Sequence, residues 1–229
     1  AAIFSSMKDP VIEAQITVDR EAFKETRLPV ELTAADGRVI EARSLPLADG
    51  RATFRRNAGD LPDGDCFLTV LGNRFRLRKL PPSRGEVYLD KDGGAYIDGR
   101  PFVPFGWYGS ALADSPCGNT AQSYMTFATA AEAKDYLDQV QRKNPGLKIV
   151  IAPYLKGALF DGAGARQGTL SPEQKTALSA FADAVKTHPA MLAYYMADEP
   201  ELQQHNPEWY REARELLTEV DPYHPTIMV

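Results

Sequence analysis

Residues 191–200, MLAYYMADEP, form the stretch of sequence that decides the fold. The apolar and aromatic run 191–196 leads into two adjacent carboxylates, Asp198 and Glu199, and Pro200 then stops further strand pairing. This pattern predicts a buried strand with two acids at its C-terminal end. Parallel α/β folds place their chemistry at the C-terminal ends of strands. The two carboxylates are therefore a candidate acid–base site; the alternative is that they are solvated loop residues that cap the next helix.

The sequence on both sides of this strand alternates between predicted strands and helices. Helix-capping residues at Thr129, Ser171 and Asn206 each precede apolar residues at helical spacing. Buried strands separated by such helices are typical of a parallel sheet with right-handed crossovers. We predict five strands in this part of the chain, beginning near Phe102, Ala121, Lys148, Met191 and Pro225.

The N-terminal third of the sequence has a different pattern. Residues 10–80 contain short runs of alternating apolar and polar residues, separated by turn signals such as Asp36-Gly37 and Asp49-Gly50. Several short strands without helical periodicity predict a small β-sandwich. The proline-rich stretch 81–85 is the best candidate for a linker between two domains. We therefore expect a β-sandwich domain of immunoglobulin-like or carbohydrate-binding-like type over residues 1–85, and an α/β domain over residues 86–229.

Composition and charge narrow the possible partners. The chain has 229 residues, 44% of them hydrophobic and 25% charged, and no apolar run approaches the ~20 residues of a membrane span. The net charge of −5 argues against a nucleic-acid partner. Residues 1–90 contain 14 basic and 14 acidic side chains, so the whole excess of acids lies after residue 90. Such an excess fits a site for neutral or cationic ligands, although solvated helix faces would give the same sum.

The cysteines and histidines do not predict a metal or cofactor site. Cys66 and Cys117 match no metal-binding spacing, and two isolated thiols are expected, with a disulfide left open. The three histidines stand near prolines at element boundaries, which predicts loop positions. The first residues, AAIFSSMKDP, contain no visible signal peptide, but a processed N-terminus would look the same. We predict a secreted or periplasmic protein with no metal and no cofactor.

Four motifs taken together resemble a known family. They are YIDGRPFVPFG at 96–106, Gly-Asn-Thr at 118–120, a hydrophobic strand that ends in APY at 152–154, and ADEP at 197–200. In this order they resemble the retaining glycoside hydrolases built on a (β/α)8 barrel of the TIM type. The resemblance is strongest to the β-galactosidase-like and cellulase-like members with an N-terminal sandwich, and it covers about residues 87–229.

The resemblance implies roles for the residues at the end of the fourth strand. In the family this strand ends in Asn-Glu-Pro, and Glu199 matches the Glu that acts as general acid/base. Asp198 stands in place of the Asn that contacts the sugar 2-hydroxyl. We expect a raised pKa for Glu199, from the charge of Asp198 and from apolar walls supplied by nearby strand residues, Tyr194, Tyr195 and Met196.

The resemblance also implies a carbohydrate substrate with β-linkages and a retaining double-displacement mechanism. Aromatic rings at the C-terminal ends of the strands can stack on sugar rings, and the alternative is that they belong to the core or to loop packing. The candidate substrate-binding residues are therefore Asp198 and the aromatic residues Trp107, Tyr108, Tyr124 and Tyr154.

Five strands with their helices cannot close an eight-stranded barrel, so we expect an incomplete barrel in this chain. The resemblance places the nucleophile, a Glu, on a seventh strand that this sequence does not contain. Further strands would have to come from residues outside the sequence or from another chain.

The sequence also allows two other functions. One is a non-catalytic carbohydrate-binding or adhesion protein on a degenerate barrel, a hypothesis motivated by the Asp at position 198. The other is an unrelated open α/β enzyme, for which no Gly-x-Gly-x-x-Gly or phosphate-loop motif is present.

Overall fold

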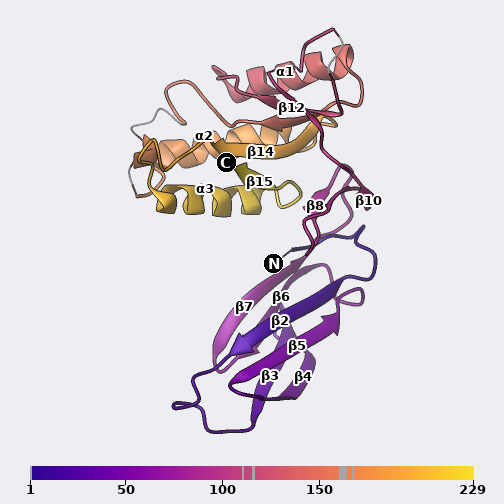
Figure 1. Ribbon diagram of the computed structural model, residues 1–229, viewed down its shortest axis with the longest axis vertical. Coiled ribbons are helices and arrows are strands. Elements are labelled where there is room, and N and C mark those ends of the chain that lie inside the picture. The colour runs from indigo at the N-terminus through magenta and orange to yellow at the C-terminus, as the bar shows by residue number, and fades with distance from the viewer. Residues whose placement is uncertain (1, 110, 115–116, 160–163, 167) are drawn as a thin grey trace. The chain divides into compact units, whose positions relative to one another are not determined.

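The computed structural model describes residues 2–109, 111–114, 117–159, 164–166 and 168–229. The chain divides into two compact units, Ala1–Pro82 and Ser83–Val229 (Figure 1). Each unit has hydrophobic clusters of its own, and the helices of the described residues all belong to the second unit. The mixed α/β class predicted from the sequence is confirmed.

The first unit consists of two sheets. The larger sheet has the strand order β1-β7-β6-β3-β4 and the smaller pairs β2 with β5. One hydrophobic core takes side chains from both sheets, among them Leu32 of β3 and Phe54 of β5, which are almost fully buried. The strands are β1 (Ala2–Ile3), β2 (Val11–Thr17), β3 (Arg27–Ala34), β4 (Val39–Pro46), β5 (Arg51–Asn57), β6 (Gly64–Val70) and β7 (Asn73–Lys79).

The turns of the first unit follow the predicted turn residues. Gly37, between β3 and β4, has φ +86°, and Asp49 and Gly50, between β4 and β5, have φ +49° and +75°. Two consecutive residues with positive φ give the tight hairpin turns that match the twist of the flanking strands. The predictions of turns at these two places are confirmed.

The second unit is built on a five-stranded sheet with three helices. A short antiparallel sheet, in the order β10-β9-β8, precedes it in the chain. The elements are β8 (Val87–Leu89), β9 (Ala95–Ile97), β10 (Arg100–Pro101), β11 (Gly106–Tyr108), β12 (Thr120–Ser123), α1 (Ala130–Lys143), β13 (Lys148–Ile151), the 3₁₀ turn η1 (Gly164–Arg166), α2 (Pro172–Val185), β14 (Met191–Ala197), α3 (Pro207–Val220) and β15 (Thr226–Met228).

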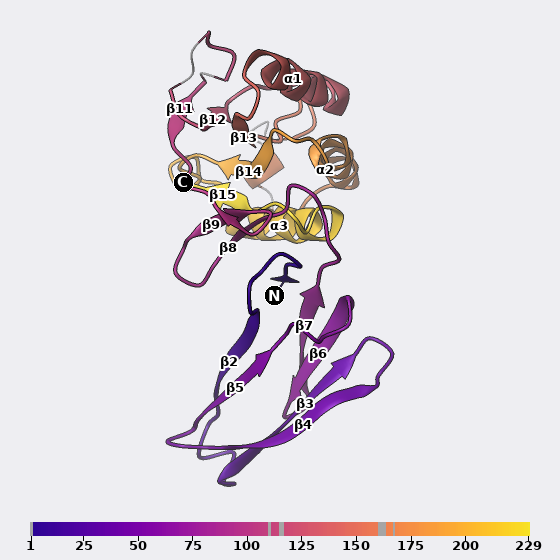
Figure 2. The same cartoon turned by 90° about the vertical axis from the view of Figure 1, so that its right-hand side faces the viewer.

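All neighbouring strands of the five-stranded sheet run parallel, in the order β11-β12-β13-β14-β15. The helices α1, α2 and α3 connect successive strands and lie on one side of the sheet (Figure 2). A doubly wound sheet would reverse its strand order and carry helices on both faces, whereas a (β/α)8 barrel keeps the order of the chain. Because β11 and β15 are both edges, the sheet is not closed into a barrel within the described residues.

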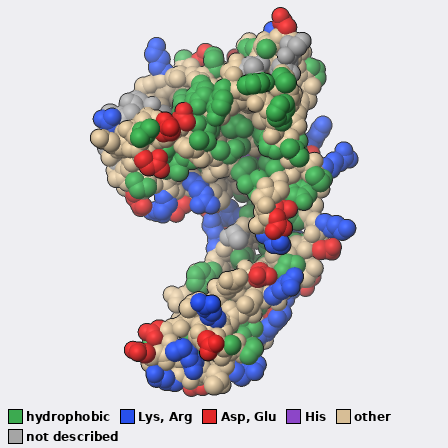
Figure 3. Space-filling model, viewed as in Figure 1, with side chains coloured by type: hydrophobic (Ala, Val, Ile, Leu, Met, Phe, Trp, Pro, Cys, Tyr) green, Lys and Arg blue, Asp and Glu red, His purple; other side chains and the backbone are tan. Residues whose placement is uncertain are grey.

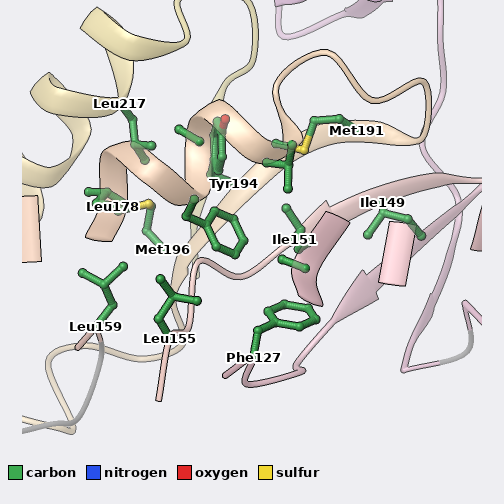
Figure 4. Close-up of a cluster of buried hydrophobic side chains, with 14 of the residues drawn as sticks. Phe127, Ile149, Ile151, Leu155, Leu159, Leu178, Met191, Tyr194, Met196 and Leu217 are labelled. Atoms are coloured by element: carbon green, nitrogen blue, oxygen red, sulfur yellow. The ribbon is translucent and has the colours of Figure 1, made fainter. Parts of the chain in front are cut away.

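The helix side of the sheet holds the main core of the second unit. Ile151 of β13 and Met196 of β14 pack against Leu178 of α2 and Leu217 of α3 (Figure 4). These side chains are between 0% and 3% exposed, and burying each one contributes about 1.5–3 kcal/mol. The helices begin at the predicted caps: the side chain of Ser171 accepts a hydrogen bond from the amide of Gln174, which completes a capping box.

The opposite face of the sheet is only partly covered. Val87 of the hairpin packs with Val150, Leu192 and Tyr195, and its amide donates a 2.8 Å hydrogen bond to the carbonyl of Tyr223. Hydrophobic side chains remain exposed elsewhere on the second unit, as Figure 3 shows on one side of it. They include residues at both sheet edges and at strand ends, Trp107, Tyr108, Tyr124, Ile227 and Met228.

The first strand of the five-stranded sheet starts later than predicted, and the second is short. The first begins at Gly106 rather than near Phe102, because Pro101 and Pro104 lack the amide hydrogens that a strand ladder needs. The second, expected to begin near Ala121, is the short strand Thr120–Ser123, and Phe127 beyond it forms an isolated bridge to Leu155.

Candidate active site

The strand β14 brings the two predicted acids to one end of the sheet. Tyr194 and Met196 belong to the core on the helix side, whereas Ala193 and Tyr195 belong to the cluster on the other face. Side chains of a strand alternate between its faces, and here both faces are covered, so β14 is buried along its whole length. The next residue, Asp198, is half-buried at the C-terminal end of the strand.

A buried polar network holds the segment between α3 and β15 against β14. The Tyr194 hydroxyl donates a 2.6 Å hydrogen bond to Oδ2 of Asp221, and Nδ1 of His224 lies 2.8 Å from the same oxygen. Oδ1 of Asp221 accepts a bond from the amide of Tyr223. Burial, followed by the charge of Asp221, raises the pKa of Tyr194, so this hydroxyl remains a donor. The network fixes β15 beside the end of β14.

Glu199 leaves the strand with an unusual backbone. Its φ is +45°, a left-handed conformation that costs a residue with a Cβ atom about 1–2 kcal/mol. Its amide donates a 2.7 Å bond to the carbonyl of Val229, and its carbonyl accepts a bond from the amide of Leu202. The side chain is exposed and has no hydrogen bond or ion pair among the described residues.

The expected apolar walls around Glu199 are therefore absent. Tyr194, Tyr195 and Met196 are all buried, but they pack within the sheet and its two faces, while the Glu199 carboxyl lies in solvent. The left-handed turn at Glu199 separates its side chain from the strand residues before it. The prediction that apolar side chains enclose the Glu199 carboxyl is therefore wrong: among the described residues, this carboxyl is exposed.

Asp198 has a close aromatic neighbour. The Tyr124 hydroxyl, from the segment after β12, donates a 3.1 Å hydrogen bond to Oδ2 of Asp198 and lies 3.4 Å from the Tyr195 hydroxyl. The rings of Tyr124 and Tyr108 are stacked, with their centroids 5.4 Å apart. One polar and aromatic cluster thus joins the C-terminal ends of three strands of the sheet, β11, β12 and β14.

The tyrosines of this cluster keep their protons. Loss of hydration, and then hydrogen bonds to Tyr195 and Asp198, raise the pKa of Tyr124. Burial, with the neighbouring Tyr195 and Asp198, raises the pKa of Tyr154 to about 12. A negative charge on either phenol would be poorly hydrated and close to the Asp198 carboxylate. Both hydroxyls are therefore hydrogen-bond donors around neutral pH.

A pocket of about 260 Å³ opens beside Asp198. On one side of it, Nδ1 of His205 lies 2.6 Å from the Tyr210 hydroxyl. Next to Asp198, the Gln203 amide donates a 2.7 Å bond to the Asp198 carbonyl. The pocket is lined by Tyr124, Tyr154, Ala197, Asp198, Gln203, His205 and Tyr210.

Sequence reasoning did not identify three of these lining residues, Gln203, His205 and Tyr210. The histidine was placed in a loop without a role, and the other two were not singled out. The available signal was their position: all three lie within 11 residues of Glu199, in the segment that follows the fourth strand. Loops after the C-terminal ends of strands supply binding residues in parallel α/β folds.

The first strand is held by close backbone contacts. A Cβ atom on Gly106 would lie 1.5 Å from the carbonyl oxygen of Thr120, so only glycine fits there. The side chain of Asn119 accepts a 2.9 Å bond from the amide of Phe105 and donates one of 2.9 Å to the carbonyl of Val103. The Gly-Asn-Thr motif thus has a positioning role, since it fixes the strand that carries Tyr108.

The predicted site residues separate into three groups. Asp198, Tyr124 and Tyr154 line the pocket, and Tyr108 stacks on Tyr124 beside it. Glu199 follows Asp198 but is not part of the pocket lining. Trp107 pairs in register with Ala121, a core residue of the helix side, whereas Tyr108 pairs with Gln122. Since strand side chains alternate, Trp107 lies on the other face of β11, away from the pocket.

Another cleft lies in the first unit. It has about 880 Å³ and opens between β2 and β7, with mostly apolar side chains such as Ile12, Ile16 and Leu77 on its walls. It lies between strands of the two sheets, and its described lining takes no residue from the C-terminal ends of the parallel strands, where the predicted acids lie. We therefore place the candidate active site beside Asp198.

Metal binding and membrane spanning find no support in the part of the chain that the structure describes. Within it, no group of three or more His, Cys, Asp or Glu side chains is arranged to hold a metal ion. The helices in this part are too short or too polar to cross a membrane.

Comparison of the sequence with known proteins gives no match. No family model matches the chain, and no curated protein is significantly similar to it.

Solved structures do resemble the chain, at low sequence identity. A candidate glycoside hydrolase from Bacteroides vulgatus has 12% identity and a TM-score of 0.43, over 99% of this chain and 55% of that protein. The β-glucuronidase from Parabacteroides merdae has 11% identity and a TM-score of 0.42, over 98% of this chain and 33% of that protein. An exo-chitosanase from Amycolatopsis orientalis has 12% identity and a TM-score of 0.37, over 95% of this chain and 29% of that protein. The chain thus spans about half or less of the length of these proteins.

Proposed function

We propose that this chain contributes part of the active site of a glycoside hydrolase that acts on β-linked oligo- or polysaccharides. The observation that carries the proposal is the position of Asp198 and Glu199 at the C-terminal end of β14, next to a pocket lined by tyrosines. Carboxylates serve glycoside hydrolysis as acid, base and nucleophile. Tyrosine rings and hydroxyls can stack on sugar rings and bind their hydroxyl groups.

Glu199 is the proposed general acid/base. In a retaining mechanism its carboxylic acid protonates the glycosidic oxygen while a second carboxylate attacks the anomeric carbon and forms a glycosyl-enzyme. The Glu199 carboxylate then takes a proton from the water molecule that hydrolyses this intermediate. The second carboxylate must lie about 5–5.5 Å from the first. We propose that it is a Glu on a seventh barrel strand outside this sequence.

The bound sugar completes the environment of Glu199 in this proposal. The side chain is exposed in the free chain, and a pyranose ring placed over it would displace water from its carboxyl group. Removal of water favours the protonated form, which a general acid needs near neutral pH. The left-handed backbone at Glu199 supports a functional role, because strained backbone conformations are concentrated at active sites and ligand-binding sites.

Asp198 and the tyrosines are the proposed sugar-binding groups. Asp198 has one oxygen bonded to the Tyr124 hydroxyl, and its other oxygen can accept a bond from a sugar hydroxyl. Tyr108, Tyr124 and Tyr154 supply aromatic surface on the same side. Trp107 would contribute only if the substrate extends around the edge of β11.

The proposal extends to the organisation of the whole protein. Residues 1–85 would form a β-sandwich domain, and residues 86–229 the first part of a (β/α)8 barrel whose remaining strands lie outside this sequence or in another chain. A protein that degrades glycans in this way would act in a secreted or periplasmic location, without a metal or other cofactor.

The test is the substitution Glu199→Gln in the full-length natural protein. We expect hydrolysis of β-glycosides with poor leaving groups to fall by about 10²–10⁴-fold, because these need protonation of the leaving oxygen. Activated aryl glycosides should lose much less in the glycosylation step, since their leaving groups depart as anions. Glu201→Gln, which changes another exposed acid two residues away, is the matched control. Equal losses for both kinds of substrate would contradict the acid role.

A second candidate function is carbohydrate binding without turnover. It is favoured by one observation: among the described residues of the pocket lining Asp198 is the one carboxylate, and Glu199 lies outside the lining. A binding protein needs no second carboxylate. Glycan binding that survives Glu199→Gln, together with no turnover by the full-length protein, would support this function over hydrolysis.

A further inference from the structure

The carboxylate of Asp198 differs from two other shielded acids of the second unit, Asp221 and Glu212. Asp221 pairs with a histidine at 2.8 Å, and Glu212 pairs with a lysine at 2.6 Å. Asp198 is also half-buried, yet among the described residues no lysine, arginine or histidine forms an ion pair with it. Its side chain accepts the hydrogen bond of Tyr124, a neutral donor. A partly desolvated carboxylate without a counter-charge is unfavourable, so this group is suited to receive a cation.

The other described residues of the pocket lining supply no positive charge. No lysine or arginine is among the lining residues that the structure describes. His205 is held against the Tyr210 hydroxyl at 2.6 Å. Burial, and then the positive charge of Arg166, lower the pKa of His205, so its ring is neutral at neutral pH. Arg166 itself is not part of the lining. Among the described lining residues, the Asp198 carboxylate is therefore the one formal charge.

The aromatic residues of the lining also favour a positively charged ligand. Tyr124, Tyr154 and Tyr210 all contribute to the pocket walls, and the π-electrons of tyrosine rings attract cations. Their hydroxyls remain protonated, so none of the three adds a formal negative charge that would be lost on titration near neutral pH. Several aromatic rings around one carboxylate are a combination that recognises ammonium groups better than neutral hydroxyl groups.

We propose that the pocket beside Asp198 binds a protonated amine, and that the glycan recognised by this chain contains an amino sugar with a free amino group. The inference rests on the proposed function in taking the amine to be carried by a sugar. The pocket, at about 260 Å³, is below the ~300–1,000 Å³ of ordinary ligand sites, which suits a single sugar ring with its substituent. The acidic excess after residue 90, 17 acidic against 12 basic side chains, would also attract a polycationic glycan.

The experiment measures binding by the 229-residue chain with isothermal titration calorimetry at pH 6, where sugar amines carry their proton. The probes are a β-1,4-linked tetrasaccharide of glucosamine, its fully N-acetylated counterpart and a glucose tetrasaccharide of the same linkage. We expect the free amine form to bind about tenfold more tightly than both neutral forms, as one charge-assisted contact would give. Added salt should weaken only the binding of the amine form.

Three variants identify the residue responsible. Asp198→Asn, which preserves the shape of the side chain, should remove the preference for the amine. Glu201→Gln should retain it, because this exposed acid is outside the pocket. Tyr124→Phe should weaken binding of all probes but retain the preference, since the carboxylate keeps its charge.

The inference is overturned if the three probes bind equally, if none binds, or if the preference survives Asp198→Asn. Because the readout is binding, it is independent of turnover. A full-length protein that hydrolyses neutral β-glucans, with a chain that shows no amine preference, would uphold the proposed hydrolase and reject the amino-sugar specificity. Amine-selective binding by the chain, together with no turnover by the full-length protein, would uphold the amino-sugar specificity and reject the hydrolase.

Discussion

The hydroxyl of Tyr124 donates a 3.1 Å hydrogen bond to Oδ2 of Asp198 and so joins the ends of β12 and β14 across the parallel sheet. The two residues are 74 positions apart in the chain, and the intervening strand β13 contributes Tyr154, just beyond its end, to the same pocket. Parallel strands in sequential order bring their C-terminal ends to one edge, which explains why residues so distant in sequence meet here.

Replacing Tyr124 by phenylalanine should weaken glycan binding while preserving the fold. The variant keeps the ring stacked on Tyr108 but loses the hydroxyl that orients Asp198 and that can itself bind a sugar hydroxyl in the pocket. A net hydrogen bond of about 0.5–1.5 kcal/mol corresponds to an affinity loss of about two- to tenfold. Titration calorimetry with the tightest-binding tetrasaccharide measures it. The control is Tyr96→Phe, which removes a hydroxyl bonded to Asp90 in the hairpin and should leave affinity unchanged.

Replacing Gly106 by alanine should displace the first strand of the sheet. The added methyl group would stand 1.5 Å from the Thr120 carbonyl oxygen, so β11 must move away from β12. Such overpacking costs about 1–3 kcal/mol or more. The fluorescence of Trp107, the next residue, should change, and the thermal midpoint should fall. Gly168→Ala is the control, because its Cβ would be at ordinary contact distance, 3.5 Å from the nearest atom. Equal stability of both variants would contradict the close contact.

Replacing Asp221 by alanine should destabilise the second unit by about 2–4 kcal/mol. The change leaves the buried hydroxyl of Tyr194 and the ring of His224 without their shared acceptor. Both tryptophans of the chain, Trp107 and Trp209, lie in the second unit, so urea unfolding followed by tryptophan fluorescence reports on this unit alone.

The matched control for Asp221 is Asp183, which forms an exposed ion pair with Lys186 at 2.6 Å. Its carboxylate side chain is 60% exposed, and surface pairs of this kind contribute under about 1 kcal/mol. Asp183→Ala should therefore shift the urea midpoint only slightly. A shift as large as that of Asp221→Ala would show that the buried network has no special role.

The central strand and the helices could be predicted because local sequence determines them. The continuous apolar run of 191–196 leaves no polar side for solvent, and the structure has β14 over Met191–Ala197. Ser171 and Asn206 accept hydrogen bonds from the amides of the first turns of α2 and α3, as cap residues do. These interactions span two or three residues, so they are visible in the sequence itself.

The surroundings of the acids could not be predicted, because they depend on contacts between distant segments. A left-handed backbone at Glu199 has no signal in a sequence where glycine or asparagine would be the usual residue. Its amide bonds to the carbonyl of Val229, 30 positions away. The pocket residues His205 and Tyr210 enter the site only through the path of the loop between β14 and α3.

The stability of the second unit should fall as the pH drops below about 6.5, and His188 is one cause. Nδ1 of its ring accepts a 3.1 Å hydrogen bond from the amide of Ala190, and Nε2 lies 3.1 Å from Oδ1 of Asp138 and donates to it. Burial lowers the pKa of His188 from its ordinary value of 6.5, against the opposing effect of Asp138. A proton on Nδ1 would also face the Ala190 amide, so the folded state prefers the neutral ring.

The sign of the effect follows from the numbers of bound protons. Just below pH 6.5 the unfolded chain binds a proton at His188 that the folded chain resists, so the free energy of unfolding decreases as the pH falls. Above this value both states are neutral at His188 and its contribution is constant. Urea unfolding followed by tryptophan fluorescence at pH 8 and pH 5.5 should therefore give a lower midpoint at pH 5.5.

The variant His188→Gln separates this residue from the other histidines. Glutamine does not titrate and can still donate to Asp138, so the variant should show a smaller difference between the two pH values than the natural chain. The pKa of His205 is lowered as well, by burial and by Arg166, so its own contribution has the same sign and should persist in this variant. The variant His205→Gln, and the double variant with both histidines replaced, measure the contribution of His205 to the pH dependence of stability. A full pH difference in His188→Gln would mean that the buried ring of His188 takes up its proton without cost to the fold.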